Sequence, residues 1–132
     1  MDTLLEPISV KPTVEVQVLS EYLPDNSQPD ANLYAFAYHV NIVNKGEKPA
    51  KLVGRHWVIM DGDQQVEEVK GVGVVGEQPL IQPGQTFKYS SGAILRTPVG
   101  SMYGSYRMLS TDGTTFEAPI QPFTLAHPRA LH

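Results

Sequence analysis

Apolar and polar residues alternate with a period of two along most of the chain, which is the pattern of half-buried β-strands. The clearest case is residues 33–43, LYAFAYHVNIV, where aromatic and β-branched side chains fill every second position. These positions predict one core-facing side of a strand: Tyr34, Phe36, Tyr38, Val40 and Ile42. Further strands are predicted at residues 13–19, 50–60, 65–70, 86–95, 100–111 and 115–126.

Turn signals separate these stretches at intervals of roughly 8–12 residues, and no stretch combines helical periodicity with a cap. Asn-Lys-Gly-Glu at 44–47 and Asp-Gly at 112–113 indicate hairpin-type turns. The short polar strand at 65–70 suits a sheet edge. Prolines and a shift of apolar phase in the last strand predict an edge or a bulge there. We therefore expect an all-β immunoglobulin- or fibronectin type III-like sandwich of seven or eight antiparallel strands, with a closed barrel as the alternative.

Length and composition indicate one domain that needs no covalent staple. For 132 residues one domain is expected, and the chain contains no cysteine, which excludes disulfides and thiolate metal sites. The strand pattern places the sandwich domain at residues 13–126, between an N-terminal arm at 1–12 and a C-terminal tail at 127–132. The N-terminus lacks the pattern of a signal peptide, and no apolar run reaches the ~20 residues of a membrane span. A cytoplasmic protein without membrane insertion is the expectation.

The net charge of −4 and the absence of any Lys/Arg run argue against nucleic-acid binding, which depends on neutralising phosphates. A divalent metal site needs three or four ligands, and the sequence offers only a few scattered candidates. His39 and His56 lie on strands predicted to be neighbours, and Asp61 or Asp63 could add an oxygen if the two rings paired across one face. No His-x-His spacing requires this, so hydrogen-bonded or surface imidazoles are expected.

The segment 71–76 matches the motif G-x-G-x-x-G through Gly71, Gly73 and Gly76. In a dinucleotide-binding unit this motif joins a strand to a helix, but Pro79 and Pro83 exclude a helix here. Two interpretations remain. The glycines either let a loop adopt positive φ angles, or they expose backbone N–H groups as an anion nest with Arg55 as a charge partner.

Catalytic chemistry is not expected, because no serine lies in the setting of an activated nucleophile with a base and an orienting group. No cofactor is predicted. Trp57 shares a strand face with Arg55, and both residue types are enriched at interfaces. A tryptophan in the third strand of a sandwich is nevertheless more typical of the core, and we expect Trp57 to be buried.

Three segments resemble the ApaG family. Residues 55–61 resemble its R-x-W-x-I-x-D strand, and residues 71–79 and 83–92 its G-x-G-V-V-G-x-Q-P and P-G-x-x-F-x-Y-x-S-G signature. Residues 100–106 fit its G-x-M-x-G-x-Y region, so the resemblance spans roughly residues 13–126. It implies a fibronectin type III-like sandwich in a bacterial cytosol and an association with cobalt and magnesium resistance or efflux. Similar domains in F-box proteins and in a DNA-polymerase-interacting protein imply a role in protein interaction.

Together these observations predict a non-catalytic binding module with a protein partner. An exposed strand edge or apolar sheet face adds a homodimer as a second expectation. The alternative function is a sensor of a phosphate-like anion or a divalent metal that uses the 71–76 loop.

Overall fold

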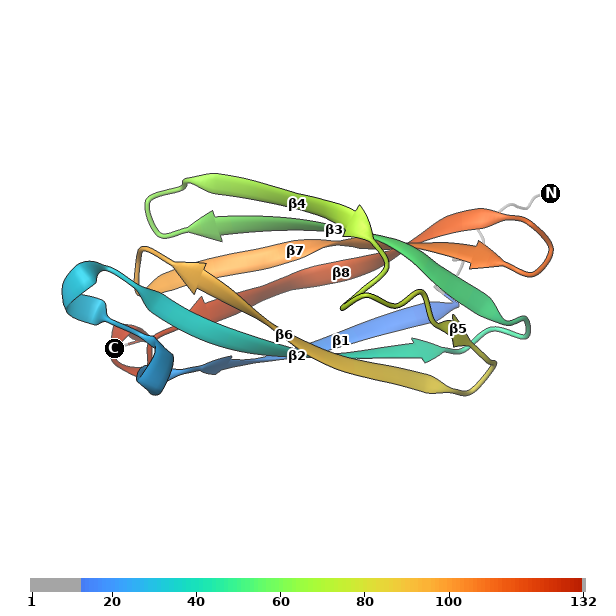
Figure 1. Cartoon of the computed structure of the whole chain (residues 1–132), viewed down its shortest axis with the longest axis horizontal. Helices are drawn as coiled ribbons and strands as arrows, with labels where there is room; N and C mark the ends of the chain where they lie inside the picture. Colours follow the sequence, from blue (N-terminus) through green and yellow to red (C-terminus); the bar gives the residue numbers. More distant parts are fainter. Residues whose placement is uncertain (1–12, 132) are drawn as a thin grey trace, which may run out of the picture.

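The computed structural model describes residues 13–131, which form two antiparallel sheets packed face to face (Figure 1). The first sheet has three strands in the order β1 (Val14–Tyr22), β2 (Tyr34–Asn44) and β6 (Thr86–Leu95). The second has the order β4 (Val66–Val72), β3 (Ala50–Asp61), β7 (Val99–Ser110) and β8 (Thr115–Ala126), with the short β5 (Leu80–Ile81) paired to the start of β3. Single 3₁₀ turns lie at Pro24–Asn26, Pro29–Ala31 and Pro128–Leu131. The predicted β-sandwich is confirmed, and the predicted arm at 1–12 lies outside the described residues.

The core fills the space between the two sheets, as the alternating pattern predicted. On β2, Phe36, Val40 and Ile42 are each at most 1% exposed. Trp57 of β3 is 2% exposed, which confirms that it is a core residue. Its ring lies 5.2 Å from that of Tyr38 across the sandwich, measured between centroids. Aromatic side chains of this size supply much of the buried apolar area of a small domain.

The two expected edge strands lie where the sequence placed them. β4 and β8 are the outer strands of the second sheet. In the β7–β8 pair, Met102 faces Phe123 and Gly104 faces Ile120, so β8 carries one residue more than β7 between these pairs. This bulge contains Pro122 and accounts for the shift of apolar phase in the last strand.

The link between β2 and β3 is not the hairpin that the Asn-Lys-Gly-Glu signal predicted, and that prediction is wrong. β2 pairs with β1 and β6, whereas β3 pairs with β4, β5 and β7, so residues 45–49 cross from one sheet to the other. The crossing is fixed by the buried side chain of Asn44. Its amide group donates to the carbonyls of Lys48 (2.9 Å) and Ile81 (2.8 Å), and its oxygen accepts the Gly46 amide (2.9 Å).

The sandwich is closed along one side and open along the other. β1 runs beside β8, where the Ser20 hydroxyl donates to the Thr124 carbonyl at 2.9 Å. On the opposite side, β4 and β6 each end their own sheet without pairing to one another (Figure 1). Among residues 13–131 the second side therefore presents two unpaired strand edges, which are the usual points where a protein accepts an added strand.

Candidate functional site, a groove between β4 and β6

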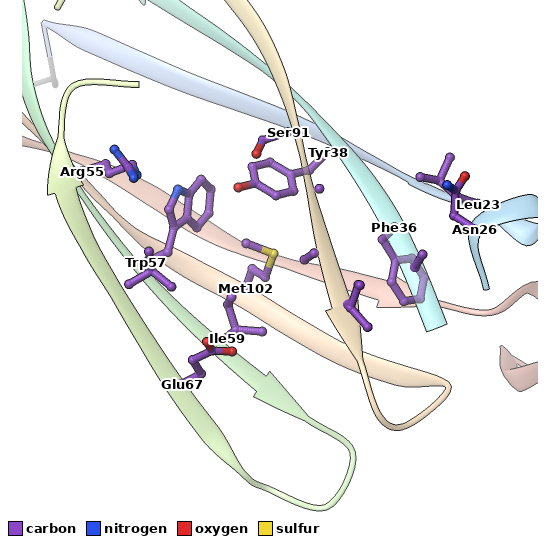
Figure 2. Close-up of a pocket in the computed structure, with 15 residues that line it drawn as sticks. Leu23, Asn26, Phe36, Tyr38, Arg55, Trp57, Ile59, Glu67, Ser91 and Met102 are labelled. Carbon is purple, nitrogen blue, oxygen red and sulfur yellow. The ribbon is translucent and has the colours of Figure 1, made fainter. Parts of the chain in front are cut away.

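A groove of about 700 Å³ occupies the open side of the sandwich (Figure 2). Its floor consists of core side chains contributed by both sheets, namely Phe36, Tyr38, Trp57 and Met102. These are at most 7% exposed, so the accessible surface belongs to the walls above them. The volume lies within the range of ~300–1,000 Å³ that is usual for ligand pockets.

The two walls of the groove differ in kind. β4 contributes Glu67 and Val69, which are two residues apart and so share the inward face of the strand. β6 contributes four consecutive residues, 91–94, although their side chains alternate between the two faces. Consecutive residues can line a groove only where the strand presents its edge. The β6 wall is therefore backbone, and because β6 pairs only with β2 in the described part of the chain, alternate residues direct N–H and C=O groups to its open edge.

A guanidinium group forms one end of the groove. Arg55 faces Gly71 in the β3–β4 register, and a Cβ atom at Gly71 would lie only 2.6 Å from Cζ of Arg55. Nη1 of Arg55 donates to the carbonyls of Val72 (3.2 Å) and Gly73 (3.0 Å). Glu67, Val69 and Gly71 form the inward row of β4, which is the set of residues on the face of the strand that points into the groove. Because Gly71 has no side chain, the Arg55 guanidinium occupies the position that a side chain of residue 71 would take in this row. The other end of the groove is formed by Leu23 and Asn26 together with Ile94.

The glycine motif folds as a tight turn at the Arg55 end. Val75 (φ 41°) and Gly76 (φ 80°) both have positive φ, and the amides of Val74 and Glu77 each donate to the other's carbonyl at 2.8 Å. The Gly73 amide donates to the carbonyl of Val53 at 3.1 Å. The expected positive φ angles are confirmed for Gly73 (φ 62°) and Gly76 but not for Gly71, and β5 rather than a helix follows the turn.

The structure brings Arg55 and the 71–76 loop together, as the sequence predicted, but through carbonyl oxygens of the loop. The amides of Gly73, Val74 and Glu77 already bond within the protein. Anion binding by this loop stays a prediction.

The two histidines lie on different sheets, so the idea that their rings pair across one face is wrong. Successive strands β2 and β3 switch sheets at the Asn44 crossing. His39 bonds to Ser90 (2.6 Å) and Glu21 (3.0 Å), and His56 bonds to Glu68 (2.9 Å). The expected hydrogen-bonded imidazoles are confirmed.

Asp61, the third candidate metal ligand, stabilises a turn. The carboxylate of Asp61 accepts the amides of Asp63 (2.8 Å) and Gln65 (2.9 Å) between β3 and β4. Within the part of the chain that the structure describes, no three His, Cys, Asp or Glu residues are grouped to hold an ion.

Two tyrosines have their hydroxyl groups hydrogen-bonded to one another: the partly buried Tyr89 of β6 and the fully buried Tyr106 of β7. Burial raises the pKa of Tyr89 to about 12, although its bond to Tyr106 lowers it in part. Burial and the neighbouring Tyr89 raise the pKa of Tyr106 as well. Neither phenol therefore ionises near neutral pH, and both serve as polar anchors between the sheets rather than as bases.

Sequence reasoning missed the residues that give the groove its walls. Glu67 and the β6 edge became visible only when the positions of the sheet edges were known. A weak signal did exist, since the period-two rule places Glu67 on the same face of its strand as the apolar Val69. An acidic residue on an inward face is unusual unless that face is open to solvent or to a partner.

The fold and the groove define a class of protein: a small β-sandwich domain whose sheets part along one edge to form a groove. Family comparison then shows which family the chain belongs to. Residues 24–110 match the model of the ApaG domain, and the chain belongs to the ApaG family. It is 55% identical to Protein ApaG of Aromatoleum aromaticum over 124 residues, covering 94% of this chain and 98% of that protein. It is 56% identical to Protein ApaG of Pseudomonas syringae pv. tomato over 119 residues, covering 90% and 94%.

A crystal structure of the ApaA protein from Bordetella pertussis has the same fold. It superposes with a TM-score of 0.86 at 49% identity, covering 88% of this chain and 94% of the other. None of the helices formed by residues 13–131 is long and apolar enough to cross a membrane.

Proposed function

We propose that this ApaG-family chain is a non-catalytic protein-interaction module that holds a segment of a partner protein in the groove between β4 and β6. The observation that carries the proposal is the pairing of an apolar, ligand-sized groove with two free strand edges. A cavity for a small molecule needs no strand edge, whereas an added peptide strand uses one for its main-chain hydrogen bonds.

The chemistry of the groove favours binding over catalysis. Its charged lining groups are Arg55 and Glu67, which lie at different places along β3 and β4. Arg55 cannot act as a base, and Tyr89 and Tyr106 keep their protons near neutral pH because their pKa values are raised. In the cytoplasm, such a module would contribute to cobalt and magnesium resistance through the partner that it binds.

Adjacent serines on β6 provide the test. Ser91 lines the groove, whereas Ser90 points to the outer face and bonds to His39. A displayed library of random peptides is selected on the purified chain, and the enriched peptides are titrated against Ser91→Tyr and Ser90→Tyr. The side chain introduced by Ser91→Tyr fills the groove, so we expect it to weaken binding at least about tenfold. Ser90→Tyr leaves the groove open and should bind like the unmodified chain.

Trp57 fluorescence supplies an independent measurement of binding, because Trp57 is the single tryptophan of the chain and lies in the groove floor. Its emission should shift when a selected peptide binds. If the library yields no binder, or if the binders ignore Ser91→Tyr and leave the Trp57 emission unchanged, the groove is not the binding site and the proposal is overturned.

A further inference from the structure

We infer that the partner segment is an extended strand that pairs with the free edge of β6 and carries a basic residue, an apolar residue and an acidic residue at successive inward positions. This inference rests on the proposed function and specifies its ligand. In sequence the segment reads basic-x-apolar-x-acidic. The groove determines each of these features separately.

The inward row of β4 sets the order of the side chains. From one end it presents the carboxylate of Glu67, then Val69, and then the guanidinium of Arg55 in the place left by Gly71. These positions are two residues apart, so the row spans about 13 Å at ~3.3 Å per residue. An extended ligand has the same period, and its alternate side chains therefore meet an anion, an apolar surface and a cation in turn.

The edge of β6 sets the conformation of the ligand. Residues 91–94 line the groove consecutively and offer unpaired backbone groups, whereas β4 offers only side chains of one face. A ligand that pairs with β6 satisfies those groups and directs alternate side chains toward Val69 and Ala93 above the Trp57 floor. A helical ligand would leave the β6 edge unpaired.

The direction of the ligand follows from how β6 runs along the groove. Ile94 and Leu95, near the end of β6, lie beside Ile59 and Glu67. Arg55 lies toward the earlier part of the strand, where its charge acts on Tyr89. A strand antiparallel to β6 therefore passes Glu67 first and Arg55 second. Antiparallel pairing is the arrangement throughout both sheets, and it is slightly more stable per residue than parallel pairing.

The charge at each end supports this polarity. The Glu67 end also contains Asp61 and Arg96, which leaves one net negative charge there. The Asp61 carboxylate already accepts two turn amides, so Glu67 is the carboxylate best placed for a ligand cation. At the other end, the Arg55 guanidinium bonds to the carbonyls of Val72 and Gly73 through Nη1. An acidic ligand side chain can therefore meet its other N–H donors.

Synthetic peptides of about ten residues with alternating threonine test the inference. The probe carries Lys, Phe and Asp at three successive inward positions, and its comparison peptides have Lys and Asp exchanged or both replaced by Asn. Affinity is measured by fluorescence anisotropy. We expect the Lys-x-Phe-x-Asp peptide to bind about tenfold more tightly than the exchanged peptide, with the Asn peptide between them. Equal affinities, or tighter binding of the exchanged peptide, would overturn the proposed charge order.

A charge reversal in the protein gives the matched control. Glu67 faces the groove, and its neighbour Glu68 faces the outer side, where it bonds to His56. Glu67→Lys should weaken the Lys-x-Phe-x-Asp peptide and strengthen a peptide with Asp at both charged positions, whereas Glu68→Lys should change neither. Equal responses of the two variants would contradict the assigned contact.

Amide hydrogen exchange separates this inference from the general function. Pairing with the bound peptide should protect every second amide between Tyr89 and Leu95. In an edge strand, the N–H groups of alternate residues point away from the neighbouring strand and toward an added one. Binding without period-two protection would overturn the β6 pairing and leave groove binding standing. Binding by library peptides but by none of these designed ones would likewise overturn the inference alone. Self-association that Glu67→Lys abolishes would identify a second copy of the chain as the occupant and overturn the inference.

Discussion

Nη1 of Arg55 lies 3.0 Å from the carbonyl oxygen of Gly73, eighteen residues away in sequence, and this bond ties β3 to the glycine turn. The contact exists because Gly71 leaves room for the guanidinium between them. One arginine thus holds the turn in place and supplies the cation of the groove.

Gly71→Ala should displace the Arg55 guanidinium, because the new Cβ would lie 2.6 Å from Cζ and both Nη atoms. The arginine is flexible and can move, so we expect the loss of its bonds to the turn to cost about 1–2 kcal/mol of unfolding free energy. Urea denaturation of Gly71→Ala, Arg55→Ala and the double variant measures this. The double variant should cost less than the two single changes added together. Strict additivity would show that the two residues do not interact.

Gly104→Ala should be far more damaging, because the atom in its way belongs to the backbone. A Cβ at Gly104 would lie 1.9 Å from the carbonyl oxygen of His56 on the neighbouring strand. The strands would have to separate, and we expect a loss of about 3 kcal/mol or more. Gly54→Ala is the control, since its Cβ would meet its nearest neighbour at an ordinary 3.5 Å. Thermal unfolding that places both variants at the same midpoint would contradict this account.

The strands and their core faces could be predicted from sequence because period-two alternation is a local property. Each strand carries its own pattern, and the burial of Trp57 follows from its position in the third strand. Which strands become neighbours is not local. The turn after Asn44 has the composition of a hairpin, yet Asn44 bonds to Ile81, thirty-seven residues away, and directs the chain into the other sheet.

The same distinction between local and non-local features explains which parts of the candidate site could be predicted. The link between Arg55 and the glycine loop could be predicted, because both belong to recognisable segments. The groove could not, since it exists only where the edges of two sheets face one another. The period-two rule assigns Glu67 and Glu68 to opposite faces of their strand, but only the placement of β4 at the open side shows that the face of Glu67 lines a groove.

Asn44→Ala should destabilise the fold well beyond the loss of a surface polar group. The side chain is 1% exposed and satisfies two carbonyls and one amide where the chain changes sheets. Removing it leaves these groups buried without partners, which should cost about 2–4 kcal/mol. Asn41→Ala, at a partly exposed position of the same strand, is the control and should cost less than about 1 kcal/mol. Equal midpoints in urea would show that the crossing does not depend on Asn44.

The hydrogen-bonded pair of Tyr89 and Tyr106 predicts that stability falls at alkaline pH. The Tyr89 phenol has a pKa of about 12 in the folded protein, against 10.0 for the free group. Above pH 10 the unfolded chain releases this proton while the folded chain keeps it, so the unfolded state gains free energy from ionisation. The free energy of unfolding therefore drops as pH rises from about 10 to about 12, by on the order of 1 kcal/mol per pH unit for each such tyrosine. Below pH 10 this contribution is fully present.

Tyrosine variants separate this contribution from general alkaline effects. Tyr89→Phe removes one of the two hydrogen-bonded phenols, so the slope of unfolding free energy against pH should become shallower in that window. The variant is also less stable at neutral pH, because the Tyr106 hydroxyl loses its hydrogen-bond partner. Tyr103→Phe removes an exposed tyrosine, 38% accessible, and should leave the slope unchanged. Urea denaturation at several pH values between 9 and 12 gives the three slopes, and a common slope would rule out the buried pair as the cause.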